Sequence, residues 1–117
     1  SHPNRMLIFK IFRTSEWEDL KAKGETLGAP IDCADGFIHF STASQAAETA
    51  TKHFSGIEGL WLAAIETAPL GIALKWEVSR GGAEFPHLYA TLKATDIAWC
   101  KPLPLADGAH QFPAEMD

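Results

Sequence analysis

The stretch Asp35-Gly36-Phe37-Ile38-His39-Phe40-Ser41-Thr42 joins a turn, a short apolar run and a helix start around one histidine. The Asp-Gly dipeptide is typical of a turn. The apolar run after it predicts a strand over residues 37–41. Histidine needs a partner for its ring inside such a run, and it is the side chain that best exchanges a proton near neutral pH. The first candidate site residue is therefore His39.

The two faces of this predicted strand differ in chemistry. Phe37, His39 and Ser41 share one face, and Ile38 and Phe40 share the other. We expect Ile38 and Phe40 to serve the core, and His39 and Ser41 to line a cleft. The alternative is a structural histidine bonded to a backbone carbonyl, because buried polar groups require partners in any case.

The flanking segments predict two early helices. Residues 6–13 indicate a buried strand with Lys10 as the charge in its middle. Thr14 predicts a hydroxyl cap for a first helix that Gly24 closes. Residues 27–34 are expected to form a loop. The spacing of Thr42 and Gln45 matches a capping box and predicts a second helix from residue 42 to about residue 54. Its inward stripe is expected to contain small and aromatic residues, namely Ala46, Ala47, Ala50 and Phe54.

The second half of the chain predicts strands. They are expected over residues 60–65, 72–78 and 97–103, with a turn at 69–71 and a flexible loop at 79–82. Helices early and strands late indicate an α+β class, with one domain over residues 6–105. Residues 106–117 are expected to form a loose C-terminal arm, and Ser1-His2 resembles the remnant of an expression tag.

Composition narrows the choice of partners. The chain has 117 residues and a formal net charge of −5, which argues against a surface that tracks the phosphates of DNA. No apolar run approaches the length needed to cross a bilayer, and no signal peptide is recognised. Cys33 and Cys100 lack a metal-type spacing and are expected to be free thiols in a cytoplasmic protein.

A second candidate cluster comes from the later strands. In Phe85-Pro86-His87-Leu88-Tyr89, extended backbone points His87 and Tyr89 the same way, where they could hold a ribose hydroxyl or stack on a planar ring. Glu77 faces either solvent or the cleft. The alternatives are a solvated carboxylate for Glu77 and a tyrosine that anchors an irregular loop.

Two further features bear on ligand class. A helix start at Thr42 gathers free N–H groups that suit an anion, and Arg80 could clamp a phosphate or carboxylate. A metal site from His39, His87 and Glu77 is conceivable. It is disfavoured because the short-range ligand pair typical of zinc sites is missing.

Taken in order, these motifs resemble the bacterial domain-of-unknown-function 952 family over residues 6–105. They are Ile8-Phe9-Lys10-Ile11, Trp17, the segment 36–42 with Gln45, Trp76-Glu77 and the segment 85–89. That family is similar in fold to the ADP-ribosyltransferases, nearest the RNA 2′-phosphotransferase branch. The resemblance implies two early helices packed on split, mostly antiparallel sheets. Lys10 stands where the resemblance expects a histidine.

The resemblance also implies a nucleotide cleft of the NAD or ADP-ribose type. His39, Glu77 and His87 would be catalytic, with Glu77 stabilising positive charge on the ribose as nicotinamide leaves. Lys10, Ser41, Thr42, Arg80 and Tyr89 would bind the cofactor, which would be NAD. Two alternatives stay open: a small-molecule-binding domain without catalysis, and a metal-assisted enzyme that uses His39 and His87.

Overall fold

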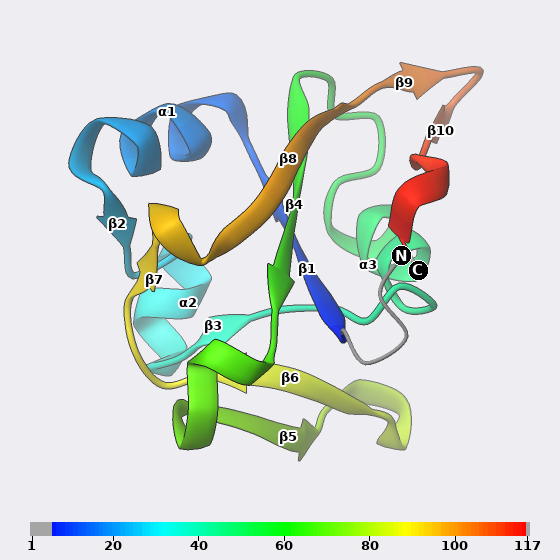
Figure 1. Cartoon of the computed structure of the whole chain (residues 1–117). Coiled ribbons are helices and arrows are strands. Elements are labelled where there is room, and N and C mark those ends of the chain that lie inside the picture. Colours follow the sequence, from blue (N-terminus) through cyan, green and yellow to red (C-terminus); the bar gives the residue numbers. More distant parts are fainter. Residues whose placement is uncertain (1–5, 117) are drawn as a thin grey trace.

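The centre of the molecule is a three-stranded antiparallel sheet with the order β1-β4-β8 (Figure 1). A computed structural model of the chain describes residues 6–116, without the side chain of Arg80. The strands are β1 (Leu7–Phe12), β4 (Leu60–Glu66) and β8 (Ile97–Leu103). All three lie where the apolar runs predict strands. β1 and β4 are mostly buried, because their side chains are largely apolar on both faces, whereas β8 is mostly half-buried.

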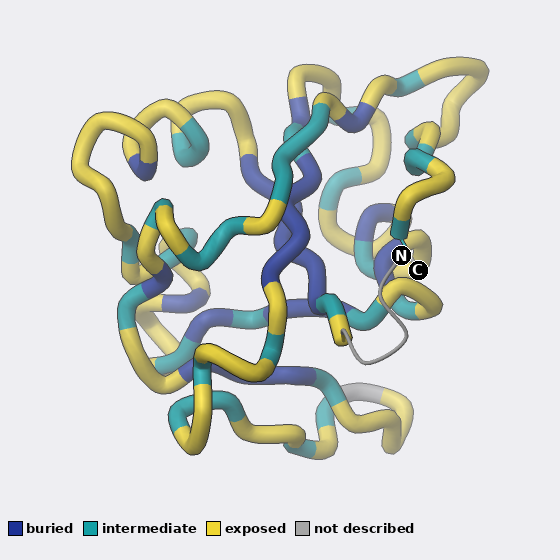
Figure 2. Tube along the Cα trace, viewed as in Figure 1, coloured by how far each residue is buried: buried dark blue, intermediate teal, exposed yellow. Residues whose placement is uncertain are grey.

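Each face of this sheet carries its own hydrophobic core. Figure 2 shows in dark blue that the central strands are mostly buried. On one face Ile8 and Phe12 of β1 pack with Leu20 of the first helix. On the other face Phe9 and Ile11 pack with residues that include Ala50. Lys10 lies between Ile8 and Phe12 in the strand and is only 8% exposed. A buried lysine requires a partner for its charge.

A second antiparallel sheet carries both candidate histidines. Its order is β3-β6-β5, with β3 (Ile38–His39), β6 (Glu84–Leu88) and β5 (Leu74–Val78). His39 is directly opposite His87 in the register of β3 and β6. The strand expected over residues 72–78 begins two residues late, because Ala68–Ala73 forms a 3-10 helix. Residues 69–71, where a turn was expected, are part of that 3-10 helix.

One segment joins the two sheets. The Phe40 amide donates to the Pro86 carbonyl at 3.0 Å, on the side of β6. One residue later, Ser41 exchanges two backbone hydrogen bonds with Phe9 of β1, at 2.7 and 2.9 Å. The segment after β3 therefore passes from one sheet to the other within two residues.

Helix α1 (Thr14–Lys23) follows β1 and ends at Gly24, whose φ of 79° is the left-handed conformation that glycine tolerates. The cap differs from the expectation. Arg13 occupies the N-cap position, and its backbone N–H donates to the Glu16 carboxylate. The Thr14 hydroxyl instead donates to the carbonyl of Gly59.

The expected loop at residues 27–34 is wrong, because it contains most of helix α2 (Pro30–Asp35). Pro30 fits the first helical turn, where no N–H is needed, and Asp32 accepts from the Ala29 amide. Gly36 then ends the helix in the left-handed conformation. The short strands β2 (Glu25–Thr26) and β7 (Leu92–Lys93) pair beside it.

Helix α3 (Ala46–His53) is shorter than the helix expected over residues 42–54. Residues 42–45 form a turn, in which the Thr42 amide donates to the Gln45 side chain. Ala46 and Ala50 face the core as expected. Ala47 is exposed, so the predicted inward stripe is narrower than the sequence pattern indicates.

The C-terminal segment is ordered and packed, contrary to the expected loose arm. Strands β9 (Leu105–Ala106) and β10 (Ala109–His110) form a hairpin. The His110 ring donates to the carbonyl of Ile57 at 2.8 Å, and Phe112 and Met116 pack against the core beside α3. These contacts involve residues distant in sequence, so the local composition did not reveal them.

The described residues thus form a mixed α+β structure with several antiparallel sheets and few helices. Among them, no helix has the length and apolar character needed to cross a bilayer. Cys33 and Cys100 are free thiols. The expected tag remnant, Ser1-His2, lies outside the described residues.

Candidate functional site

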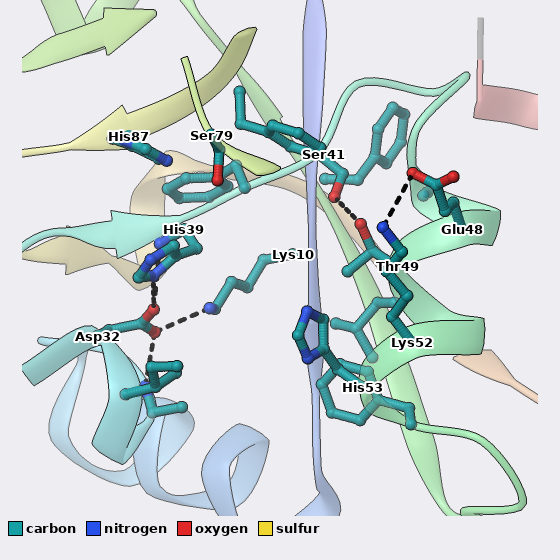
Figure 3. Close-up of a pocket in the computed structure, with 18 of the residues that line it drawn as sticks. Lys10, Asp32, His39, Ser41, Glu48, Thr49, Lys52, His53, Ser79 and His87 are labelled. Carbon is teal, nitrogen blue, oxygen red and sulfur yellow. Dashed lines mark hydrogen bonds and ion pairs between the residues drawn. The ribbon is translucent and has the colours of Figure 1, made fainter. Parts of the chain in front are cut away.

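A cavity of about 640 Å³ lies between β1, α2 and the β3–β6 pair on one side and α3 on the other (Figure 3). Its volume falls in the range of small-molecule sites. The polar and charged side chains that line it come from β1, α2, β3, α3 and β6 and from segments between the elements. They are Lys10, Arg13, Asp32, Asp35, His39, Ser41, Glu48, Thr49, Lys52, His53, Ser79 and His87.

Asp32 anchors one wall of the cavity, and its side chain is almost fully buried. Its Oδ2 accepts from Lys10 Nζ at 2.8 Å and from the Ala29 amide at 2.7 Å. Its Oδ1 accepts from His39 twice, at 2.6 Å from the ring Nδ1 and at 3.1 Å from the backbone amide. This carboxylate therefore joins β1, α2 and β3 at one point.

Three hydrogen bonds and one nearby charge decide the ionisation of Asp32. Burial alone would raise the pKa of this carboxyl group. The hydrogen bond from His39, the charge of Lys10 and the hydrogen bonds from Lys10 and Ala29 outweigh burial and lower the pKa from 3.8 to about 2. Asp32 is therefore a carboxylate at neutral pH, and it balances the buried ammonium of Lys10.

His39 is held between two carboxylates. Its Nδ1 contacts Asp32, and its Nε2 lies 3.1 Å from Asp35 Oδ2 at the end of α2. Both ring nitrogens are therefore engaged within the protein. The side chain is about one-third exposed and lines the cavity, so the ring edge remains accessible to a ligand. The alternative of a backbone carbonyl partner is not the arrangement observed.

His87 enters the cavity from β6 and is held on one edge only. Its Nδ1 lies 2.7 Å from Glu77 Oε1 on the neighbouring strand β5. The Phe37 ring stacks on its face at 4.2 Å between centroids. Its Nε2 is buried and has no hydrogen-bond partner. A buried polar atom without a partner is uncommon and marks a place where a ligand or water can bind.

The two candidate histidines are neighbours. Their ring centroids are 5.2 Å apart with the rings edge to face, and Phe37 contacts both. Both line the same cavity. The structure therefore brings together the early His39 and the late His87, which are far apart in the chain.

Glu77 and Tyr89 belong to this cluster but do not line the cavity. Glu77 Oε1 accepts from both His87 and the Tyr89 hydroxyl, each at 2.7 Å. The bonds from His87 and then Tyr89 lower the pKa of Glu77, and the bond to Glu77 raises the pKa of Tyr89. Tyr89 lines a smaller hollow on the other side of Phe37. Glu77 therefore lies outside the lining of the cavity, and its direct role at the ligand stays a prediction.

The opposite wall of the cavity belongs mainly to α3. The Ser41 and Thr49 hydroxyls bond each other at 2.8 Å. Lys52 is 3.8 Å from Glu48 on the same helix, which is a long ion pair. Arg13 lies over the Phe54 ring, 4.9 Å from its centroid, and is 3.7 Å from Glu16. These two cations are partly exposed and engaged only at long distance.

Of the expected ligand-binding residues, Thr42 differs from the prediction, and the prediction for Arg80 stays open. Thr42 is outside the lining of the cavity, and its hydroxyl bonds Ser44. Arg80 lies in a short 3-10 turn after β5, and its side chain is outside the described part of the structure. Ser41 does line the cavity, as does Lys10, but Lys10 is paired with Asp32.

Metal ligation is not favoured by this arrangement. Within residues 6–116, no group of three or more His, Cys, Asp or Glu side chains is placed to hold a metal ion. Both ring nitrogens of His39 already contact carboxylates, so this histidine offers no lone pair without losing a bond.

The sequence prediction missed Asp32, whose carboxylate accepts four hydrogen bonds in the site. It lies two residues after Pro30, and a proline followed by an acidic residue is a helix-start pattern that could have identified α2. Its link to Lys10 spans 22 positions and has no local signature.

Fold and cavity together define a small α+β protein with a histidine-lined cavity. The model of a family described as "Protein of unknown function (DUF952)" matches residues 11–100, and the chain belongs to this family. The resemblance to that family is thereby confirmed. No curated protein matches the chain.

Solved structures of one bacterial protein are similar to this chain. The crystal structure of protein CC0527 from Caulobacter crescentus is 51% identical, with a TM-score of 0.86 over 90% of this chain and 93% of that one. The solution NMR structure of CC0527 is 48% identical, with a TM-score of 0.80 over 89% of this chain and 90% of that one.

Proposed function

We propose that the cavity binds a small nucleotide-type ligand of the ADP-ribose or NAD class, that His87 takes part in proton transfer on that ligand, and that His39 orients the ligand beside it. The observation that carries this proposal is the buried, unpartnered Nε2 of His87 in the cavity that His39 also lines. The likeness of the family to ADP-ribosyltransferases, which the sequence motifs indicate, supports the choice of ligand class.

The two walls suit the two ends of such a ligand. Arg13 and Lys52 on the α3 side carry positive charge that phosphate oxygens can bind. On the other side, Lys10 has three N–H donors, of which Asp32 takes one. A ribose hydroxyl placed between Lys10 and His87 would meet both a donor and an acceptor.

Proton transfer requires a ring nitrogen that the ligand can reach and that the protein does not already occupy. His87 lines the cavity, and its buried Nε2 is not occupied by the protein, because Glu77 holds only the opposite nitrogen. His39 is held by two carboxylates and is suited to orienting a hydroxyl or stabilising negative charge beside it.

Binding is tested by a thermal-shift panel of NAD, ADP-ribose, AMP and adenosine, followed by calorimetry on each ligand that responds. A ligand at about one hundred times its Kd stabilises the folded state by about 2.7 kcal/mol. We expect the phosphorylated ligands to shift Tm more than adenosine. Lys52→Gln should weaken their binding, and Lys23→Gln is the control because Lys23 pairs with Asp19 outside the cavity. No shift with any of the four ligands would refute the proposal.

Turnover is tested separately by nicotinamide release from NAD. The carboxylates that line the cavity are Asp32, Asp35 and Glu48, and Glu77 is not among them. We therefore expect Asp35→Asn to slow nicotinamide release more than Glu77→Gln does. If Glu77→Gln abolishes release while Asp35→Asn leaves it unchanged, then Glu77 reaches the ligand after all.

A binding domain without catalysis is the second candidate function. One observation favours it: Lys10 stands where the resemblance expects a histidine, and its ammonium is fixed on Asp32. Binding of ADP-ribose together with the absence of nicotinamide release would select this candidate.

A further inference from the structure

The carboxylate of Glu77 determines which nitrogen of His87 carries the hydrogen. An ionised carboxylate only accepts hydrogen bonds, so the His87 nitrogen 2.7 Å from Glu77 Oε1 must be the donor. The bonds from His87 and Tyr89 lower the pKa of Glu77, which keeps it ionised at neutral pH. The neutral His87 ring therefore carries its hydrogen on Nδ1 and a lone pair on Nε2.

The ring is also fixed in orientation. Phe37 stacks on it at 4.2 Å with an angle of 27° between the ring planes. His87 is 5% exposed and is directly opposite His39 in the sheet register, so it has little room to rotate. The edge that carries Nε2 is the edge left for the cavity, because Glu77 holds the other edge from outside it.

We propose that Glu77 is a positioning residue that acts from outside the cavity: it holds His87 in the Nδ1–H tautomer, so that Nε2 accepts a hydrogen bond from a hydroxyl or N–H group of the ligand. Tyr89 supports Glu77 from the surface through the second bond to Oε1. The statement about the ligand rests on the proposed function, whereas the statement about the tautomer does not.

This arrangement sets the orientation of the ligand. A phosphate oxygen is an acceptor, and it would face the lone pair of Nε2 without a hydrogen between them. The phosphate end of the ligand therefore binds toward Arg13 and Lys52, and a hydroxyl-bearing end reaches His87. The class of ligand is one that carries an anionic group at one end and a hydrogen-bond donor at the other.

The test is a two-bond proton–nitrogen NMR correlation of the unliganded protein, which reports the tautomer of each histidine. It is recorded as a series over pH, and the tautomer is read from the spectra in which the ring is neutral. We expect His87 as the Nδ1–H tautomer in the wild type. Glu77→Ala should lower the ratio of Nδ1–H to Nε2–H at least about tenfold, because a hydrogen bond to a charged group is lost.

Tyr89→Phe is the matched control, because it removes the other donor to Glu77 and keeps the carboxylate. It should leave the His87 tautomer unchanged. An Nε2–H tautomer in the wild type, or an unchanged ratio in Glu77→Ala, overturns the role of Glu77. A merely structural Glu77 would alter stability without moving this ratio.

The statement about the ligand is tested on the same spectra with ribose 5-phosphate and inorganic phosphate. We expect ribose 5-phosphate to move the His87 Nε2 resonance and inorganic phosphate to leave it in place. A response to inorganic phosphate, or to neither compound, overturns the statement about the ligand. The tautomer measurement still decides the role of Glu77 in that case.

Discussion

The two histidine–carboxylate pairs of the cavity differ in where the carboxylate lies. Asp32 beside His39 is 1% exposed and also neutralises the buried Lys10. The Glu77 side chain beside His87 is 38% exposed and lies outside the cavity. The distances from carboxylate to Nδ1 are nearly equal, at 2.6 and 2.7 Å.

The two hydrogen bonds have similar lengths, but we expect their loss to change the free energy of unfolding by different amounts. Removing one partner of a buried charge pair leaves an unpaired charge that water cannot solvate, whereas an exposed carboxylate is replaced by water at low cost. We infer that Asp32 supports the structure of the site and that Glu77 adjusts its chemistry. The following four predictions test this difference.

Asp32→Ala should have the largest effect. It leaves the Lys10 ammonium buried without its partner and removes the acceptor of His39, at a cost of about 3 to 5 kcal/mol in the free energy of unfolding. Urea denaturation measures this change. Asp35→Ala is the control, because Asp35 contacts His39 from a more exposed position, and it should cost about 1 kcal/mol or less. Similar losses for the two variants would contradict the distinction.

Gly28→Ala should displace Asp32 without changing its chemistry. A Cβ at Gly28 would lie 2.2 Å from Asp32 Oδ2, and the φ of 97° disfavours any side chain. We expect a loss of about 2 to 3 kcal/mol. Gly24→Ala has a similar φ of 79° with no atom within 4 Å, and it should cost only about 1 kcal/mol. If both variants lose the same free energy of unfolding, the close approach of the added Cβ to Asp32 does not contribute to the loss.

Acid should remove the contribution of Asp32 over a defined range of pH. The pKa is lower in the folded state, so the stabilisation is complete above the ordinary value of 3.8 and is lost as the pH falls through about 2. The loss amounts to about 2 kcal/mol. The measurement is the free energy of unfolding against pH, compared with Asp32→Asn. If the wild type and Asp32→Asn lose stability in parallel across this range of pH, the Asp32 carboxyl group is not the source of the loss.

Glu77→Ala should have the smallest effect on stability among these variants, because its carboxylate is partly exposed and its partners stay in place. The urea midpoint should shift less than in Asp32→Ala. The tautomer of His87 should change nevertheless. A loss of stability as large as that of Asp32→Ala would place Glu77 among the structural residues.

The sequence predicts the strands and the histidines of this site well, because their signals are local. The apolar runs mark β1, β4 and β8, and the Asp-Gly dipeptide precedes the run that contains β3 and His39. The α+β class follows from the order of these elements. His87 is found because it lies in a short apolar strand between Pro86 and Leu88.

The partners of these residues could not be read in the same way. Helix α2 has six residues, which is too short for a helical period to appear, so Asp32 was assigned to a loop. The separation of Glu77 from the cavity depends on the pairing of β5 with β6, in which Glu77 lies opposite Phe85. The alternation of side chains along one strand shows which residues share a face, but it does not show which other segments pack on that face.

For Lys10 too, the sequence shows the position of the residue but not its partner. Its position in the middle of a buried strand is evident from the sequence, and a role in binding phosphate was expected. The structure gives it Asp32, 22 positions away, as a partner at 2.8 Å. A charge in a core strand predicts that a counter-charge exists, whereas its identity depends on the tertiary fold.

The exchange of backbone hydrogen bonds between Phe9 and Ser41 has a consequence for how the molecule can be observed in motion. Separation of the two sheets at this point breaks both bonds while leaving the ladders within each sheet intact. Hydrogen–deuterium exchange at these two amides therefore reports local separation of the sheets wherever that separation is more frequent than global unfolding. Slower exchange on addition of a ligand would report closure of the cavity around it.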